Sequence, residues 1–383
     1  MRAAASERCE RPVPLVYTLH TGRLDGTERM ALALLDGMPE RPLHVYAPPS
    51  APGASVVEEA RRRGWAAREV RGIVGLARAL LPVFVRHRTV EVVSTSVRHN
   101  LLCMLLGRLL FVRVRQLNVV HGAGGAQESY ARKRRLNGTA VRVVAVSRFV
   151  AGRLRRHGVD GERVVVIGNF LAAGDLLGQP VRPPFAPAAH RACRPLDPAR
   201  VRIAVVSRID RAKRLDVLLD ALQAAGLGSV VVDVYGAGPE LEAARARARD
   251  QALAIRFHGH VRDVPHRLAQ ADLFVHLCPE EPFGLVVLEA FATGVPVLVP
   301  ASGGTAEIVR DGIDGFAYAP ADPDALAVRL REILELGPAR LDAVVAEARA
   351  TLASRFGQSV GVRAYRAALA EPAAASTAAW TAR

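Results

Sequence analysis

The sequence of 383 residues has few cysteines and few aromatic residues, and it lacks a long uninterrupted hydrophobic run. The longest apolar stretch, Leu101 to Val112, is interrupted by Arg108 and is too short for a membrane-spanning helix, which needs about 20 residues. The four cysteines have neither metal-ligand spacing nor a disulfide pattern, and we expect reduced packing residues: Cys9, Cys103, Cys193 and Cys278. These features predict a cytoplasmic protein with at most peripheral membrane contact.

Two further absences bear on export and on metal binding. The first twelve residues include charged side chains where a secretion signal needs an apolar run, so no export is expected. The histidines and cysteines form no cluster with metal-ligand spacing, so we expect no metal site and no other cofactor.

Acidic residues are outnumbered by basic ones, 37 against 52, which gives a formal net charge of +15. Such a charge attracts nucleic acid, acidic lipid headgroups or phosphorylated small molecules and does not choose among them. The most one-sided segment, Ala131 to Val159, has nine basic residues and no acidic one. It is either a solvated basic face or a surface for an anionic membrane or a phosphorylated acceptor.

Half of the residues are hydrophobic and 23% are charged, which is typical of a globular protein, and the length favours two domains. Short β-branched runs alternate with longer amphipathic segments, the pattern of parallel strands joined by helices. The predicted fold class is therefore α/β, with two Rossmann-like halves. The predicted strands are 15–19, 43–47, 90–94, 115–120, 141–146, 164–167, 202–206, 230–235, 255–258 and 273–277.

A Pro-rich stretch near the middle of the chain interrupts this alternation and predicts a linker. The predicted organisation is an N-terminal Rossmann-like domain, a linker, a C-terminal Rossmann-like domain, a last helix that packs back toward the N-terminal domain, and a flexible tail. These parts span residues 13–178, 179–199, 200–355, 356–371 and 372–383.

Candidate site residues follow the predicted strands, because ligands of doubly wound sheets bind beyond the carboxyl ends of the strands. Arg208 and Lys213 follow strand 202–206, where two cations can clamp a diphosphate and stabilise it as a leaving group. The alternative is that both are ordinary surface cations. Gly236 and Gly238 follow strand 230–235 without the third glycine of a dinucleotide fingerprint, so we interpret them as a tight turn that permits close backbone approach.

The most informative segment extends from Pro279 to Gly304. A loop with Glu281 follows the predicted strand 273–277, Gly284 and Leu285 begin a helix, and Glu289 lies one to two turns into it. Carboxylates accept hydrogen bonds from hydroxyl groups, and the free N–H groups of a helix start hold phosphate oxygens. The combination predicts a ligand that has both phosphates and sugar hydroxyls.

This segment resembles the retaining GT-B glycosyltransferases of glycosyltransferase family 4. The resemblance rests on a Glu-x7-Glu motif in the context Glu-Pro-Phe-Gly-Leu-Val-Val-Leu-Glu-Ala, followed by Gly-x-Pro-Val and a Gly-Gly turn, and extends from about Val205 to Gly315. It implies a GT-B fold, in which two Rossmann-like domains face each other across a cleft, the N-terminal one binding the acceptor and the C-terminal one a nucleotide-sugar donor.

The resemblance also implies roles for individual residues. Glu281 would bond sugar hydroxyls near the reacting carbon and Glu289 the ribose. Arg208 and Lys213 would hold the diphosphate together with the N–H groups of the helix start. The remaining donor-binding residues implied in this half are Val261, Phe283, Gly284 and Leu285.

The N-terminal half resembles the family more loosely. Gly26 lies in a segment similar to the family's donor-phosphate loop, which often has two adjacent glycines where this chain has one. His121 resembles the strand-end histidine that reaches toward the donor sugar. With Glu281, Arg208 and Lys213, it completes the implied catalytic set.

The implied activity is retaining, metal-independent transfer of a sugar from a nucleotide diphosphate sugar to a hydroxyl group. UDP-sugars are commoner donors than GDP-mannose in this family. The acceptor would be a small molecule or a lipid-linked one, in natural-product or cell-envelope glycan biosynthesis, and nucleic acid is not an expected partner. Two alternatives stay open: a sugar-nucleotide epimerase or phosphorylase of the same fold, and a basic polyanion-binding protein without catalysis.

Overall fold

The computed structural model describes residues 12–51, 53, 55–122, 126–172, 181–185, 201–322 and 324–371. The chain divides into two compact units, one made of 1–146, 150–167 and 361–383, the other of 147–149 and 168–360. Residues 168–172, which the sequence analysis assigned to the N-terminal domain, thus group with the second unit. The expectations for Cys9, Cys193, the tail and most of the linker lie outside the described residues.

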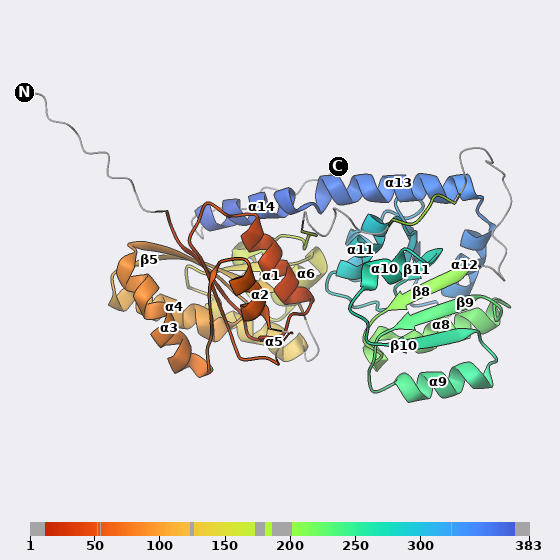
Figure 1. Ribbon diagram of the computed structural model, residues 1–383, viewed down its shortest axis with the longest axis horizontal. Helices are drawn as coiled ribbons and strands as arrows, with labels where there is room; N and C mark the ends of the chain where they lie inside the picture. The colour runs from red at the N-terminus through yellow and green to blue at the C-terminus, as the bar shows by residue number, and fades with distance from the viewer. Residues whose placement is uncertain are drawn as a thin grey trace, which may run out of the picture. The chain divides into compact units, whose positions relative to one another are not determined.

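The first unit contains a seven-stranded parallel sheet in the order β3-β2-β1-β4-β5-β6-β7, with helices between consecutive strands (Figure 1). Its elements are β1 (Leu15–Thr18), α1 (Gly26–Asp36), β2 (Leu43–Ala47), α2 (Val56–Arg62), β3 (Ala66–Glu69), α3 (Gly72–Arg86), β4 (Thr89–Ser94), α4 (Val97–Leu109), β5 (Arg113–Val120), α5 (Ala126–Arg132), η1 (Lys133–Leu136), β6 (Arg142–Ala145), most of α6 (Arg148–Arg156), η2 (Gly161–Arg163), β7 (Val164–Val166) and most of α14 (Gln358–Ala370).

The second unit contains a six-stranded parallel sheet in the order β10-β9-β8-β11-β12-β13. Its elements are β8 (Arg202–Val206), η4 (Arg211–Lys213), α8 (Leu215–Ala224), β9 (Val231–Tyr235), α9 (Leu241–Asp250), β10 (Ile255–Gly259), α10 (Val264–Leu268), β11 (Leu273–Val275), α11 (Leu285–Thr293), β12 (Val297–Pro300), η5 (Thr305–Glu307), β13 (Phe316–Tyr318), α12 (Ala325–Glu335) and α13 (Pro338–Arg355).

These two parallel sheets confirm the predicted α/β class and all ten predicted strands, with each strand end within two residues of its prediction. The sequence analysis did not predict β12 or β13. It also did not predict β3, whose residues Ala66–Glu69 lack a β-branched run, or α3, which contains Pro82. Both elements form because their apolar residues face the core: Ala67 is buried in β3, and Leu76, Leu80, Val83 and Phe84 are buried in α3.

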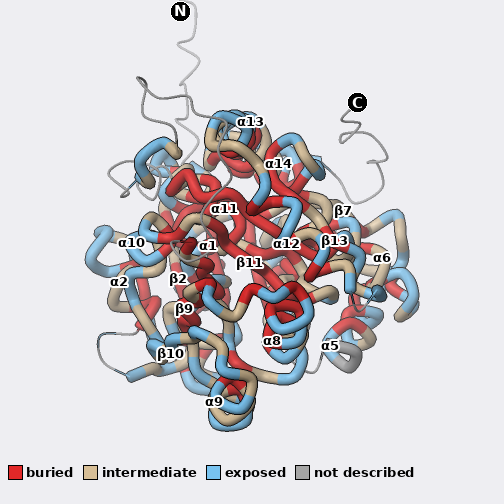
Figure 2. The backbone as a smooth tube through the Cα atoms, turned by 90° about the vertical axis from the view of Figure 1, so that its right-hand side faces the viewer, coloured by how far each residue is buried: buried red, intermediate tan, exposed pale blue. Residues whose placement is uncertain are grey.

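Burial follows the sheets in both units. Figure 2 shows buried backbone through the central strands of the second unit, whereas the outer sides of α8 and α9 are exposed. Cys103 and Cys278 are buried free thiols, which confirms that these two are packing residues, and burial raises the pKa of Cys103 to about 12.

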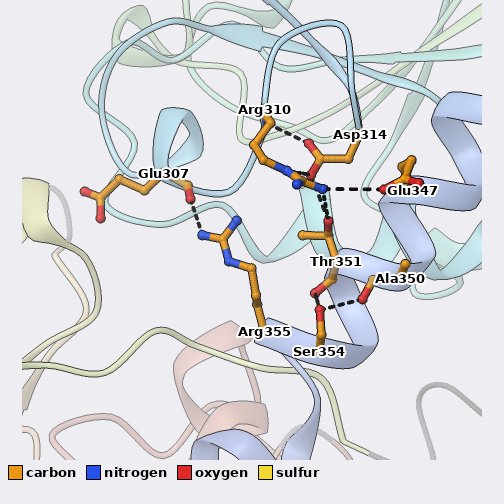
Figure 3. Close-up of polar contacts among 8 residues, drawn as sticks. All are labelled: Glu307, Arg310, Asp314, Glu347, Ala350, Thr351, Ser354 and Arg355. Carbon is orange, nitrogen blue, oxygen red and sulfur yellow. Dashed lines mark hydrogen bonds and ion pairs between the residues drawn. The ribbon is translucent and has the colours of Figure 1, made fainter. Parts of the chain in front are cut away.

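Helix α13 is attached to the turn before β13 by a buried polar network (Figure 3). The side chain of Asp314 is fully buried and accepts hydrogen bonds from Arg310 Nε at 2.7 Å and Thr351 Oγ1 at 2.8 Å. Arg310 also donates to Thr351 Oγ1, and Arg355 donates to the carbonyl oxygen of Glu307 at 2.9 Å. Since a buried carboxylate is costly unless it is paired, this network fixes the turn against the helix.

Candidate functional site

The strand order identifies where each unit can bind a ligand. In both sheets the order reverses next to the first strand: β1 lies between β2 and β4, and β8 lies between β9 and β11. The loops that leave two such neighbouring strands diverge, which leaves a crevice at their carboxyl ends. In the second unit, the loops after β8 and β11 contain Arg208, Lys213 and Glu281.

A carboxylate shapes the loop after β8. Asp210 caps the short helix η4 by accepting from the N–H groups of Ala212 and Lys213 at 3.1 and 3.2 Å. Arg208 Nε donates to the other oxygen of Asp210 at 2.5 Å, and its side chain remains 65% exposed. The cap directs Lys213 inward and leaves Arg208 accessible to a ligand, so the two cations differ in environment.

Lys213 and Glu281 meet directly. Lys213 Nζ donates to Glu281 Oε2 at 2.5 Å, and His276 Nε2 lies 3.3 Å from the same oxygen. Burial opposes ionisation of Glu281, but the neighbouring His276 and Lys213 overcome it and lower the pKa of the carboxyl to about 2. Burial likewise opposes the charge of Lys213, and Glu281 raises its pKa. Both groups are therefore ionised near neutral pH.

Glycines let the surrounding loops approach each other. A Cβ at Gly236 would lie 1.8 Å from the carbonyl oxygen of Ser207, and one at Gly238 would lie 2.1 Å from that of Ile209. The expected close backbone approach at these two glycines is confirmed, and it fixes the path of the β8 loop. In the same way, a Cβ at Gly304 would lie 2.1 Å from the carbonyl oxygen of Pro282, so the Gly-Gly turn supports the loop that contains Glu281.

The other predicted donor-binding residues of this unit differ in exposure. Gly284, with φ of 99°, precedes α11, and Leu285 is its first residue, as expected for a helix start that offers free N–H groups. Glu289 is half-buried in α11, and Val261 is half-buried after β10. Phe283 is buried and packs edge-on against Phe356, so its side chain has a packing role.

The first unit gathers polar groups at its own reversal point. His20 Nδ1 lies 2.9 Å from Thr95 Oγ1, and Lys133 donates to the carbonyl oxygen of Thr95 at 3.2 Å and to Asn118 Oδ1 at 2.7 Å. Lys133 is 5% exposed, and burial lowers its pKa to about 8. His121 follows β5, and its Nε2 is buried without a hydrogen-bond partner.

One expectation for the first unit stays a prediction and another needs correction. Gly26, predicted to bind the donor phosphate, is the exposed first residue of α1, and its φ is not positive. The glycine that the backbone requires here is Gly22, where a Cβ would lie 1.9 Å from the carbonyl oxygen of Pro48. The basic segment 131–159 is not one continuous face, because Lys133 and Arg142 are buried and Arg142 donates to the carbonyl oxygen of Ala368.

Two family models match most of the chain. The model described as glycosyltransferase family 4 matches residues 24–172, and the one described as glycosyl transferases group 1 matches residues 190–350. The chain belongs to the group 1 glycosyltransferases of glycosyltransferase family 4. This membership confirms the resemblance seen in the Glu-x7-Glu segment.

This family 4 glycosyltransferase has named relatives, and the similarity to each of them covers only part of either chain. A D-inositol 3-phosphate glycosyltransferase of Mycolicibacterium gilvum is 34% identical over 199 residues, which are 50% of this chain and 45% of that protein. A glycogen synthase of Mycobacterium tuberculosis is 38% identical over 114 residues, 29% of this chain and 27% of that one. The matched region thus spans less than half of these curated relatives.

Solved structures confirm the GT-B fold of this family 4 member. Anabaena HepE, solved in complex with UDP and glucose, has a TM-score of 0.73 at 17% identity and covers 93% of this chain and 99% of its own. WaaG, a glycosyltransferase involved in lipopolysaccharide biosynthesis, has a TM-score of 0.63 at 15% identity and covers 93% and 100%.

In each unit of this family 4 glycosyltransferase, polar residues near the carboxyl end of the sheet were not predicted from the sequence. Three of them closely follow strands: His20 after β1, Thr95 after β4 and His276 after β11. The fourth, Lys133, donates to the carbonyl oxygen of Thr95. For His276 the signal was available, because it is the only basic or acidic side chain in the apolar run from Leu273 to Cys278. Lys133 offered no such signal, since it is one of several cations in a basic run.

No group of three or more His, Cys, Asp or Glu side chains in the described part of the chain is placed to hold a metal ion. Among the same residues, no helix has both the length and the apolar character needed to cross a membrane.

Proposed function

We propose that this chain is a retaining glycosyltransferase that moves a sugar from a UDP-sugar to a hydroxyl group of an acceptor, without a metal ion. The observation that supports this most is the Lys213–Glu281 pair at the reversal point of the second sheet, beside the start of α11. A cation, a carboxylate and free helix N–H groups together match a ligand that joins a diphosphate to a sugar.

In the proposed reaction, the ammonium group of Lys213 and the exposed guanidinium of Arg208 hold the diphosphate and stabilise its charge as the bond to the sugar breaks. The N–H groups at Gly284 and Leu285 add hydrogen bonds to phosphate oxygens. Glu281 accepts from sugar hydroxyls, Glu289 from the ribose, and Val261 lies near the base. The cations thereby supply the charge stabilisation that a metal ion supplies in other transferases.

The acceptor oxygen attacks the sugar carbon on the face that the diphosphate leaves, and the departing phosphate oxygen takes the proton of the acceptor hydroxyl. The new bond therefore has the configuration of the old one. His121 contacts the donor sugar as a neutral imidazole. Other groups of the first unit, such as His20 and Lys133, belong to the acceptor side.

The relatives favour a UDP-sugar and a hydroxyl acceptor. HepE was solved with UDP and with UDP-glucose, and the name of the mycobacterial relative assigns it a phosphorylated polyol, D-inositol 3-phosphate, as substrate. For this chain, the acceptor is a small-molecule or lipid-linked hydroxyl compound of natural-product or cell-envelope glycan biosynthesis.

Thermal unfolding in the presence of UDP, GDP or ADP tests the donor, because a ligand that binds the folded state raises the melting temperature. UDP is expected to give the largest rise, and Lys213→Met is expected to remove it. Labelled UDP-sugars are then incubated with and without acceptor, and NMR of the product gives the anomeric configuration. Isomerised donor without acceptor, or release of the sugar as its phosphate, contradicts the proposal and favours the epimerase or phosphorylase.

A further inference from the structure

Helix α3 presents apolar side chains on two opposite sides. Leu76, Leu80, Val83 and Phe84 face a core cluster with β1, β2 and β4. On the opposite side, Val74, Leu81 and Val85 are 61%, 44% and 66% exposed. Their spacing of seven and four residues places them in one stripe along the helix. A helix that only covers a sheet would carry polar residues there.

Helix α4 repeats this pattern next to α3 (Figure 1). Its residues Cys103 and Leu106 contribute to the same core cluster as α3. Leu101, Leu105 and Leu109, spaced by four residues, are 38%, 53% and 64% exposed. Because the buried sides of both helices face one cluster, their exposed apolar stripes both point away from it and together form one surface, which we call the α3–α4 face. Contiguous exposed apolar surface of this kind marks an interaction site.

Phe111, directly after α4, is the most unusual residue of this face. Its side chain is 95% exposed, and its φ is 55°. It follows the C-cap residue Leu110, a place where helices usually have glycine because a side chain disfavours the left-handed backbone. Among the residues that the structure describes, Phe111 is thus the most exposed large hydrophobic side chain, and it lies at a helix-ending position that glycine would occupy without strain. Strain at an exposed position indicates a function.

The charges around the apolar stripes all have one sign. Exposed Arg78 lies within the α3 stripe, and exposed Arg98 and Arg108 lie within the α4 stripe. Neither helix contains Asp or Glu, and the only acidic residue between positions 70 and 115 is Glu91. Glu91 is buried in β4 and paired with Arg41 and Arg115. The α3–α4 face is therefore apolar and cationic without an exposed acid of its own.

We propose that the α3–α4 face binds the surface of an anionic lipid bilayer, with Phe111 and the exposed Leu and Val side chains entering the headgroup–acyl boundary. A bilayer matches both features, because its interior accepts apolar side chains and its phosphates attract arginine. A second copy of the chain matches only one, since pairing two such faces opposes arginine to arginine. The buried Lys133 and Arg142 interrupt the basic segment 131–159, which makes it the weaker candidate surface.

Vesicle co-sedimentation of the full chain tests this proposal. It needs neither donor nor acceptor, so its outcome does not depend on the proposed catalysis. We expect binding to vesicles of equal parts phosphatidylglycerol and phosphatidylcholine, weaker binding at high salt, and little binding to phosphatidylcholine alone. Phe111→Gly is expected to weaken binding roughly tenfold, the effect of withdrawing one large apolar side chain. Arg78→Gln and Arg108→Gln are each expected to weaken it about fivefold.

Phe111→Gly separates binding from folding, because glycine suits a positive φ and the melting temperature is expected to stay the same or rise. Val328→Gln is the matched control: Val328 is 49% exposed on α12 of the other unit, and its replacement is expected to leave binding unchanged. The proposal is overturned if anionic vesicles do not bind the chain, or if Phe111→Gly and Val328→Gln have equal effects. It is also overturned if Arg155→Gln reduces binding where Phe111→Gly does not. A lipid-free dimer that Phe111→Gly dissociates would instead identify a second copy as the occupant.

Discussion

Lys213 Nζ donates a hydrogen bond to Glu281 Oε2 over 2.5 Å and forms an ion pair with it. The two residues have different proposed partners, the diphosphate for Lys213 and the sugar hydroxyls for Glu281. Their opposite charges neutralise each other, which stabilises two largely buried ionised groups. The pair also places the reacting end of the site, since the bond that breaks joins the diphosphate to the sugar.

The pair predicts a strong coupling between the two side chains. Glu281→Gln and Lys213→Met are each expected to lower kcat/KM at least about 100-fold, the usual loss when one group that stabilises the transition state is removed. Because each variant also disturbs the partner, the double variant is expected to lose less than the product of the two effects. Initial rates with a UDP-sugar and an acceptor measure all three.

The two single variants and the double variant form a double-mutant cycle. Its matched control is Glu280→Gln, which removes the same charge from the exposed neighbouring residue. Its rate is expected to stay within about twofold of the wild-type rate, as for other surface substitutions. Equal losses for Glu280→Gln and Glu281→Gln, or strictly multiplicative losses in the cycle, would contradict the assignment.

The pair also predicts a pH dependence of stability. The pKa of Glu281 is lowered to about 2 in the folded chain from an ordinary 4.5, so the unfolded chain binds the proton more tightly. The carboxylate therefore contributes stability that is fully present above pH 4.5 and is lost as the pH falls toward 2. The contribution is on the order of 3 kcal/mol. Urea unfolding of the wild type and Glu281→Gln between pH 6 and pH 3 is expected to show a difference that shrinks with acid. A pH-independent difference would exclude this origin.

The positions of Lys213, Glu281 and Glu289 along the chain could be predicted from the sequence, because each lies next to or within an element whose pattern is clear. The pairing itself could not, since Lys213 and Glu281 come from loops of two strands separated by 68 positions in the chain. The first unit was harder: the prediction for Gly26 rests on a loose motif, and nothing in the sequence indicates that Gly22 approaches the backbone of Pro48. Contacts of that kind depend on how distant segments pack.

Some elements of the fold could likewise be predicted from their own residues, whereas others depend on contacts with distant segments. Strands such as Leu43–Ala47 were predicted because their apolar runs indicate them directly. Ala66–Glu69 has no apolar run, since only Ala67 is buried, and it becomes a strand by pairing with β2. The Pro-containing α3 is a helix because its apolar residues meet the sheet, so tertiary packing decides where local preference does not.

His121 is predicted to be neutral throughout the pH range of activity. Burial lowers its pKa to about 3, and the charges of His20 and Lys133 act in the same direction. NMR titration is expected to show constant ring chemical shifts for His121 from about pH 7 to pH 5, where an ordinary histidine with a pKa near 6.5 changes. Lys133→Met removes one lowering charge and is expected to raise the pKa. A midpoint above pH 6 in the wild type would contradict a buried neutral ring.

Gly238→Ala is predicted to damage the donor site through the backbone alone. Its Cβ would lie 2.1 Å from the carbonyl oxygen of Ile209, in the loop between Arg208 and Lys213, so that loop must move. We expect a destabilisation of about 1–3 kcal/mol, the usual cost of overpacking, together with weaker UDP binding. Gly152→Ala is the matched control, because Gly152 lies within α6 with open space at its Cβ. That change is expected to stabilise the chain by about 0.5–1 kcal/mol and to leave UDP binding unchanged. Urea unfolding and calorimetric titration with UDP measure both effects, and equal behaviour of the two alanine variants would show that the β8 loop does not depend on this close approach.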